Sequence, residues 1–142
     1  MNEKLRGGCL CGAVRYTIAG QPVARSSCHC RSCRLGAGAS PVAWIVVKAG
    51  DFAFSHAEPK RYASSPGVER TFCGTCGTSL TYRRLDEPAT LDITTCTLDA
   101  PDAFAPAKEI WLEDHVSWVQ VSPDVPHFSR TSLGAQPERK SP

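Results

Sequence analysis

Three cysteines, Cys28, Cys30 and Cys33, lie within six residues in the pattern C-x-C-x-x-C. Thiols this close together share a partner, and their spacing favours a metal ion. A structural zinc has four Cys or His ligands, whereas a reactive zinc has three protein ligands and one position for water or substrate. The three clustered thiols therefore indicate a working metal site. The alternative is a closed site in which His29 or Cys96 supplies a fourth ligand.

A second pair, Cys9 and Cys11, precedes an alternating segment at residues 13–18 that is typical of a strand. Residues two apart in a regular strand are separated by about 6.6 Å, whereas two thiolates on one tetrahedral zinc are about 3.8 Å apart. The backbone must therefore bend at this pair, and Gly12 tolerates the dihedral angles of such a bend. The alternative is that both cysteines are small buried residues.

The third cysteine motif is C-x-x-C-G at Cys73, Cys76 and Gly77, which is typical of a zinc knuckle. Together with the pair near the N-terminus it makes a set of four thiolates, enough to close a structural zinc site. The other use of C-x-x-C, a thioredoxin-like redox motif, requires a βαβ context that this sequence does not show.

The eighth cysteine, Cys96, lies in a segment rich in β-branched residues, 91–97, which favours a strand. We interpret Cys96 as a small buried apolar residue, since free cysteine is among the most buried residue types. The alternative, a ligand to the three-cysteine site, would close that site.

The elements that position these motifs are expected to be short strands joined by turns, because Gly and Pro number 11 each and helical patterns are few. One helical turn is expected after Cys33, within residues 34–41. Trp118 and Phe128 are interpreted as core aromatic residues. The expected strands lie at residues 42–47, 51–54, 61–62, 69–72, 79–82 and 108–112.

The length of 142 residues fits one domain, which we assign to residues 1–128, followed by a disordered tail at 129–142 that lacks periodicity. A net charge of +2 is too small to favour a nucleic-acid partner. The first residues lack the apolar stretch of a secretory signal, and no segment has membrane-spanning length. A cytoplasmic location is therefore expected, in which clustered cysteines are ligands or catalysts more often than disulfides.

These motifs in this order resemble the glutathione-dependent formaldehyde-activating enzyme family, which also includes centromere protein V. The similarity extends over about residues 5–128. It rests on the segments 7–16, 28–33, 72–77 and 98–99, on Ile110 and Trp111, on Trp118, and on the Pro-His-Phe segment 126–128. Two positions differ from what many relatives carry: Glu109, where His is common, and Cys96, where a small residue such as Gly is common.

The resemblance implies a mainly β, Mss4-like fold of short antiparallel strands, with little helix and two zinc ions. It implies a structural zinc on the first set and a catalytic zinc on the second. The structural set is Cys9, Cys11, Cys73 and Cys76, and the catalytic set is Cys28, Cys30 and Cys33.

The implied activity is that of a carbon–sulfur lyase that joins glutathione, its thiol co-substrate, to formaldehyde as S-hydroxymethylglutathione. Three thiolates on Zn²⁺ leave a charge of −1, so a further anionic sulfur needs positive charge nearby. Arg31 and Arg34 are candidates for that charge and for binding the glutathione carboxylates, unless they are solvated surface residues. His29 is a candidate proton carrier, or else a packed or exposed histidine.

A different class of function remains open on this sequence. The chain is then a zinc-stabilised binding module without turnover, whose β surface or tail binds a protein or nucleic acid. A related thiol adduct is a third possibility. The sequence leaves the oligomeric state open.

Overall fold

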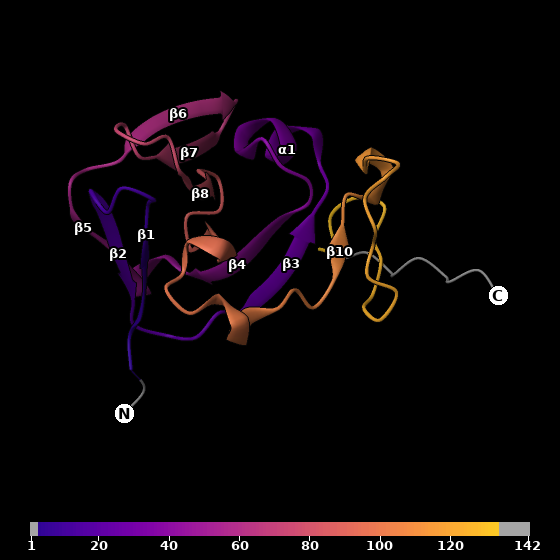
Figure 1. The fold of residues 1–142 in the computed structure, drawn as a ribbon, viewed down its shortest axis with the longest axis horizontal. Coiled ribbons are helices and arrows are strands. Elements are labelled where there is room, and N and C mark those ends of the chain that lie inside the picture. The colour runs from indigo at the N-terminus through magenta and orange to yellow at the C-terminus, as the bar shows by residue number, and fades with distance from the viewer. Residues whose placement is uncertain (1–2, 134–142) are drawn as a thin grey trace. The chain divides into compact units, whose positions relative to one another are not determined.

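Short strands build most of the computed structural model, which describes residues 3–133 (Figure 1). The predicted fold class, mainly β with antiparallel strands and little helix, is confirmed. The chain divides into two units, which are described separately. The first unit comprises the chain up to Ala24 together with Ile45–Ala105, and the second comprises Arg25–Trp44 together with the chain from Pro106 onward.

In the first unit, a three-stranded antiparallel sheet has the order β1-β2-β5, formed by β1 (Leu5–Gly8), β2 (Val14–Ile18) and β5 (Phe52–His56). Every second side chain of β2 is buried, as expected for a strand with one face on the core. Gly7 of β1 lies opposite Tyr16 of β2. A Cβ atom at Gly7 would collide with the Tyr16 ring, so only glycine fits this position.

Four further strands of the first unit are neighbours in the order β9-β8-β7-β6. The pairs β6–β7, β7–β8 and β8–β9 are antiparallel. The expected strands at 61–62, 69–72 and 79–82 are therefore present. The bounds are β6 Lys60–Ser65, β7 Val68–Phe72, β8 Ser79–Arg84 and β9 Thr90–Thr94.

The core of the first unit contains aliphatic side chains, one tyrosine and two of the predicted metal-binding cysteines. Burial of these side chains is the main favourable contribution to folding of this unit. Its members are Cys9, Val14, Tyr16, Ile18, Ile45, Val47, Cys73, Leu80, Leu91, Ile93 and Leu98.

The second unit contains α1 (Arg31–Ala37) and β10 (Glu109–Ile110). It also contains β3 (Ala24–Cys28) from Arg25 onward and β4 (Val42–Lys48) as far as Trp44. Strand β10 is parallel to β3, with Glu109 opposite Ser27 and Ile110 opposite Cys28 (Figure 1). The strand expected at 108–112 is only two residues long. It ends where Trp111 adopts a left-handed conformation, with φ of 58°.

Helix α1 differs from the expected single turn after Cys33, because it begins at Arg31 and includes Cys33. Its N-cap is Cys30, whose Sγ atom accepts a hydrogen bond from the backbone N–H of Cys33 at 3.3 Å. The helix ends at Ala37, and its C-cap is Gly38, which has a left-handed φ of 65°. Sequence patterns miss this start because the usual N-cap residues are Ser, Thr, Asp and Asn.

Two interpretations of single residues were wrong. Cys96 is exposed, because β9 ends at Thr94 and a 3₁₀-helix, η2 (Thr95–Thr97), carries the cysteine to the surface. Trp118 is 78% exposed and lies in a turn, so it is not a core residue. Phe128 is buried as expected.

The first residues of the predicted tail are hydrogen-bonded to the segment around β10. The backbone N–H groups of Glu113 and Trp111 donate to the carbonyls of Ser129 and Arg130, and Lys108 Nζ donates to Ser132 Oγ. The rest of that prediction, residues 134–142, lies outside the described residues. Within residues 3–133, no helix has the length and apolar character needed to cross a membrane.

Candidate metal centres

In the first unit, the four sulfur atoms of Cys9, Cys11, Cys73 and Cys76 all lie within 4.8 Å of one another. The Sγ atoms of Cys9 and Cys11 are 3.6 Å apart, and those of Cys11 and Cys73 are 3.7 Å apart. Two sulfur ligands of one tetrahedral zinc are separated by about 3.8 Å. The structure thus brings together the four cysteines that the sequence motifs predicted, at distances that suit this ion.

The first pair sits in the bend between β1 and β2. The N–H of Cys9 donates to the Val14 carbonyl, and the N–H of Gly12 donates to the Cys9 carbonyl. Gly12 has a φ of 78°, which supports the backbone bend that the sequence analysis required. The N–H of Val14 then donates to Cys9 Sγ at 3.3 Å. This turn therefore presents a sulfur that is already oriented by a backbone donor.

The second pair sits in the tight turn between β7 and β8. The N–H groups of Thr75 and Cys76 both donate to Cys73 Sγ at 3.4 Å. Gly77 has a φ of 81° and donates its N–H to the Cys73 carbonyl at 2.8 Å. Leu10 donates its N–H to the Thr78 hydroxyl, which ties the two turns together. This is the knuckle geometry expected from C-x-x-C-G.

The electrostatics of the four sulfurs favour a bound cation. Hydrogen bonds from the hydroxyl and N–H of Thr78 lower the pKa of Cys76 to about 5. The N–H of Ala13 favours the thiolate of Cys11, but desolvation and the neighbouring sulfurs outweigh it and raise the pKa of Cys11 to about 11. Hence the four groups do not all ionise together at neutral pH without a positive charge among them. Four thiolates around Zn²⁺ satisfy that requirement.

In the second unit, the sulfurs of Cys28, Cys30 and Cys33 also lie within 4.8 Å of one another. Cys28 is the last residue of β3, Cys30 is the N-cap of α1, and Cys33 lies in the first turn of that helix. Cys28 and Cys33 are buried. The close sulfurs of Cys30 and Cys33, together with burial, raise the pKa of Cys28 well above its ordinary value. A cation among the three sulfurs would reverse this effect, so this donor set also fits a thiophilic metal ion such as zinc.

Neither proposed fourth ligand belongs to this cluster within the part of the chain that the structure describes. The ring of His29 is fully buried, and its Nε2 atom is 2.8 Å from Glu109 Oε2. Its Nδ1 atom is buried as well and has no hydrogen-bond partner among the described residues. The interpretation of His29 as a packed histidine is therefore correct. Cys96 belongs to the first unit and is exposed.

Sequence reasoning missed the role of Glu109. It singled out this residue only because many relatives have His at the same position. Its side chain is 7% exposed, and the Oε1 atom accepts a hydrogen bond from the backbone N–H of Ser122 at 3.1 Å. The register opposite Ser27 places it beside the three-cysteine segment. A charged residue within a short alternating apolar segment was the available signal, and it pointed to no partner.

The two candidate arginines lie on α1. Arg31 is exposed, and its backbone N–H donates to Asp114 Oδ2 at 3.2 Å. Arg34 is half-buried, and its Nε atom is buried without a hydrogen-bond partner among residues 3–133. Neither guanidinium forms an ion pair within the described residues. Both therefore remain able to bind an anionic ligand.

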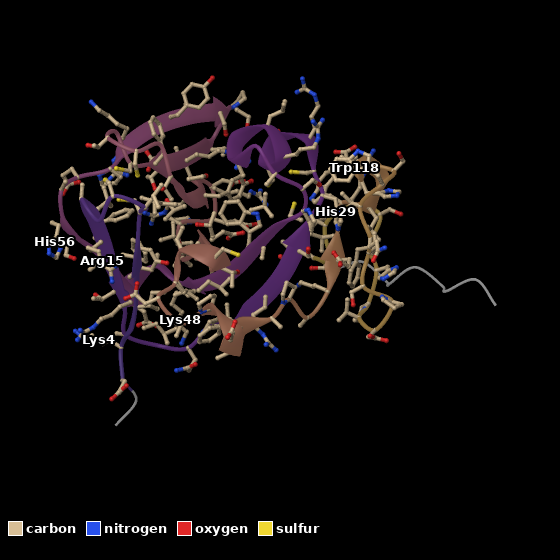
Figure 2. All side chains as sticks on the ribbon, viewed as in Figure 1. Lys4, Arg15, His29, Lys48, His56 and Trp118 are labelled. Atoms are coloured by element: carbon tan, nitrogen blue, oxygen red, sulfur yellow. The ribbon has the colours of Figure 1, made fainter. Side chains whose placement is uncertain are left out.

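Figure 2 shows His29 at the end of β3, beside β10, and Trp118 on the C-terminal segment that follows β10. The rings of His29 and His115 meet edge to face, with centroids 6.4 Å apart. Since His115 is three residues before Trp118, the exposed indole belongs to the segment that packs on the three-cysteine turn.

Comparison with known proteins places these clusters in a family context. The family model described as "Glutathione-dependent formaldehyde-activating enzyme" matches residues 4–114. A protein of Schizosaccharomyces pombe named an uncharacterized lyase is 27% identical over 113 residues, covering 69% of this chain and 82% of that protein. A crystal structure of a Rhodobacter sphaeroides protein has a TM-score of 0.57 at 20% identity, covering 67% of this chain and 88% of the other. This last similarity supports the fold alone.

Proposed function

Because the chain belongs to the glutathione-dependent formaldehyde-activating enzyme family, we propose that it is a zinc-dependent carbon–sulfur lyase that forms S-hydroxymethylglutathione from glutathione and formaldehyde. The observation that supports this proposal best is the division of seven cysteines into a group of four and a group of three. The family points to a glutathione-dependent lyase type of function, and the three-thiol group offers a place for its chemistry. The reaction itself is our proposal.

The two groups have different tasks in this proposal. The set Cys9, Cys11, Cys73 and Cys76 holds a structural zinc, since four protein ligands complete its coordination. Cys28, Cys30 and Cys33 hold the catalytic zinc with three protein ligands. When bound there, zinc supplies a Lewis acid that lowers the pKa of a fourth, exogenous thiol ligand.

The chemistry balances without an oxidant or reductant. The glutathione sulfur forms a bond to the formaldehyde carbon, the C=O π bond breaks, and the carbonyl oxygen receives the proton that the thiol has lost. The reverse reaction cleaves the same carbon–sulfur bond, which is the behaviour of a lyase. A catalyst accelerates both directions equally.

The chain positions the reactants through α1. The sulfur of Cys30 caps the helix by accepting the N–H of Cys33, so the start of α1 fixes the position of this sulfur in the cluster. Arg31 and Arg34 bind the carboxylates of glutathione and offset the charge of −1 that three thiolates leave on Zn²⁺. The buried Nε of Arg34 is consistent with this task, because that donor lacks a partner among the described residues.

Exchange spectroscopy by NMR tests the reaction on an equilibrated mixture of glutathione and formaldehyde. The two combine slowly on their own, so the measured quantity must be the rate of interconversion and not the final ratio. Wild-type protein should accelerate the exchange in proportion to its concentration, and Cys30→Ser should not. Cys96→Ser is the matched control, because this exposed cysteine is in neither cluster and should leave the rate unchanged.

Two outcomes would overturn the proposal. One is no acceleration by wild-type protein beyond an equal amount of free zinc. The other is equal acceleration by Cys30→Ser. The first outcome, with zinc bound at both sites, would leave a zinc-stabilised binding module as the better account.

A further inference from the structure

One buried carboxylate joins two distant parts of the second unit. Glu109 lies 80 residues after His29, and its Oε2 atom is 2.8 Å from His29 Nε2. Its other oxygen, Oε1, accepts the backbone N–H of Ser122 at 3.1 Å. A carboxylate accepts at both oxygens, so a carboxylate at this position pairs with the Nε2–H tautomer of His29. Both contacts of Glu109 then run from a nitrogen donor to a carboxylate oxygen.

The histidine in this contact stands between two of the three clustered cysteines, Cys28 and Cys30. Its ring is fully buried, and its backbone N–H donates to the Ile110 carbonyl at 3.0 Å. Ring and backbone of His29 are thus both held by β10. The backbone between the two cysteines has little freedom to rotate, because each end of the histidine is fixed.

Further contacts connect the same turn to the segment after β10. The backbone N–H of Arg31 donates to the Asp114 carboxylate, and the His115 ring packs edge to face on His29. Among these contacts, the one from Glu109 is the most buried, with side-chain exposures of 0% for His29 and 7% for Glu109. A hydrogen bond to a charged group is strongest where water is excluded.

We propose that Glu109 is a positioning residue for the three-cysteine metal site, acting through His29. Its carboxylate fixes the turn that carries Cys28 and Cys30, so that their sulfurs converge with that of Cys33 before a metal ion binds. This inference rests on the proposed metal site of the enzyme but not on its reaction. Groups behind the direct ligands of metal sites commonly change metal affinity by about 10- to 100-fold when they are replaced.

The substitution Glu109→Gln tests the proposal because it preserves shape and removes one acceptor. The amide has a single oxygen, so it satisfies either His29 or Ser122 and presents its NH₂ group to the other donor. We expect zinc to bind about 10- to 100-fold more weakly at the three-cysteine site, with no change at the four-cysteine site. Titration of the zinc-loaded protein with a chelator of known affinity measures the zinc affinities of both sites. The zinc-release step that is missing in Cys30→Ser belongs to the three-cysteine site.

The matched control is Lys108→Met. Lys108 is the neighbouring residue, and its side chain donates to Ser132 Oγ. Its backbone carbonyl accepts the N–H of Ser27, and the substitution preserves that carbonyl, so both affinities should stay at their wild-type values. Co²⁺ bound in place of zinc gives a second readout. The sulfur-to-cobalt absorption bands of the three-cysteine site should shift in Glu109→Gln and stay unchanged in Lys108→Met.

A double variant keeps the test informative where Glu109→Gln folds poorly. His29→Leu with Glu109→Leu removes both members of this buried hydrogen-bonded pair, and apolar replacement of both partners is often nearly neutral for stability. It should show the same selective loss of affinity. Wild-type affinity at the three-cysteine site in a folded variant would overturn the proposal, as would equal weakening at both sites, which indicates general destabilisation. Neither result depends on whether wild-type protein accelerates the glutathione reaction.

Discussion

The substitutions Cys73→Ser and Cys30→Ser should have very different effects on stability, because their two sites close chain loops of very different length. Cys11 and Cys73 lie 62 residues apart in sequence and their sulfurs meet in the four-cysteine site. A cross-link over a loop of this length removes about 4 kcal/mol of chain entropy from the unfolded state, by the relation used for disulfides. Loss of the ion from this site therefore costs a large part of the roughly 5–15 kcal/mol that stabilises a typical domain.

The three-cysteine site spans only positions 28 to 33, and the same relation gives about 2 kcal/mol for its loop. Replacement of Cys30 by serine also preserves the helix cap. The sulfur of Cys30 accepts the N–H of Cys33, and serine is one of the preferred N-cap residues. Cys30→Ser should therefore remain folded, retain one zinc and lose catalysis, whereas Cys73→Ser should be destabilised by about 4 kcal/mol or be insoluble.

Urea unfolding followed by circular dichroism measures both free energies, with zinc counted in the same samples. Cys96→Ser again serves as control, since it removes an exposed thiol from neither cluster. Equal destabilisation of Cys73→Ser and Cys30→Ser would refute the loop argument. So would a Cys73→Ser protein that is as stable as the wild type and contains one zinc.

Three further outcomes are expected. Protein purified without chelator should contain two zinc ions per chain by elemental analysis, and a value near one would contradict the assignment of metal to both clusters. Burial raises the pKa of Tyr16 from 10.0 to about 12, so its contribution to stability is complete below pH 10 and is lost as the pH rises towards 12. At pH 11 urea unfolding should show a loss of about 1.4 kcal/mol that Tyr16→Phe lacks; parallel losses in both proteins would contradict it. Arg34→Met should raise the KM for glutathione more than it lowers kcat in the exchange assay, whereas an unchanged KM would show that Arg34 does not bind this substrate.

Local patterns in the sequence were sufficient to predict most of the strands and both cysteine groups, but not β1 or β3, whose short segments lack a clear alternation. The strands follow from alternation and β-branched residues, and the groups follow from spacings that only a shared partner accommodates. The C-x-x-C-G turn at Cys73 and the bend at Cys9 are local structures, formed by backbone N–H groups and glycines a few residues away. Such features depend only on residues that are close together in the sequence, and they can therefore be predicted from the sequence.

The contacts that sequence reasoning missed depend on distant parts of the chain or on unusual local roles. The partner of His29 is 80 residues away, and no local signal specifies that Glu109 should be buried. Cys96 follows a strand pattern, yet a 3₁₀-helix turns it outward. Trp118 is apolar enough for a core but lies in a turn with 78% exposure. In each case the tertiary structure gives the residue a burial that differs from the average for its residue type.

The different sequence spans of the two cysteine groups have a consequence for protein synthesis. A nascent chain presents Cys28, Cys30 and Cys33 together once residue 33 has left the ribosome. The four-cysteine group is complete only 43 residues later, at Cys76, which at about 5–20 residues per second takes roughly 2–9 s. During that interval the local cluster can already capture a metal ion, while Cys9 and Cys11 still lack their partners. The three-thiol site, which the proposed reaction requires to keep one coordination position free, is thus the first to be exposed to metal ions in the cell.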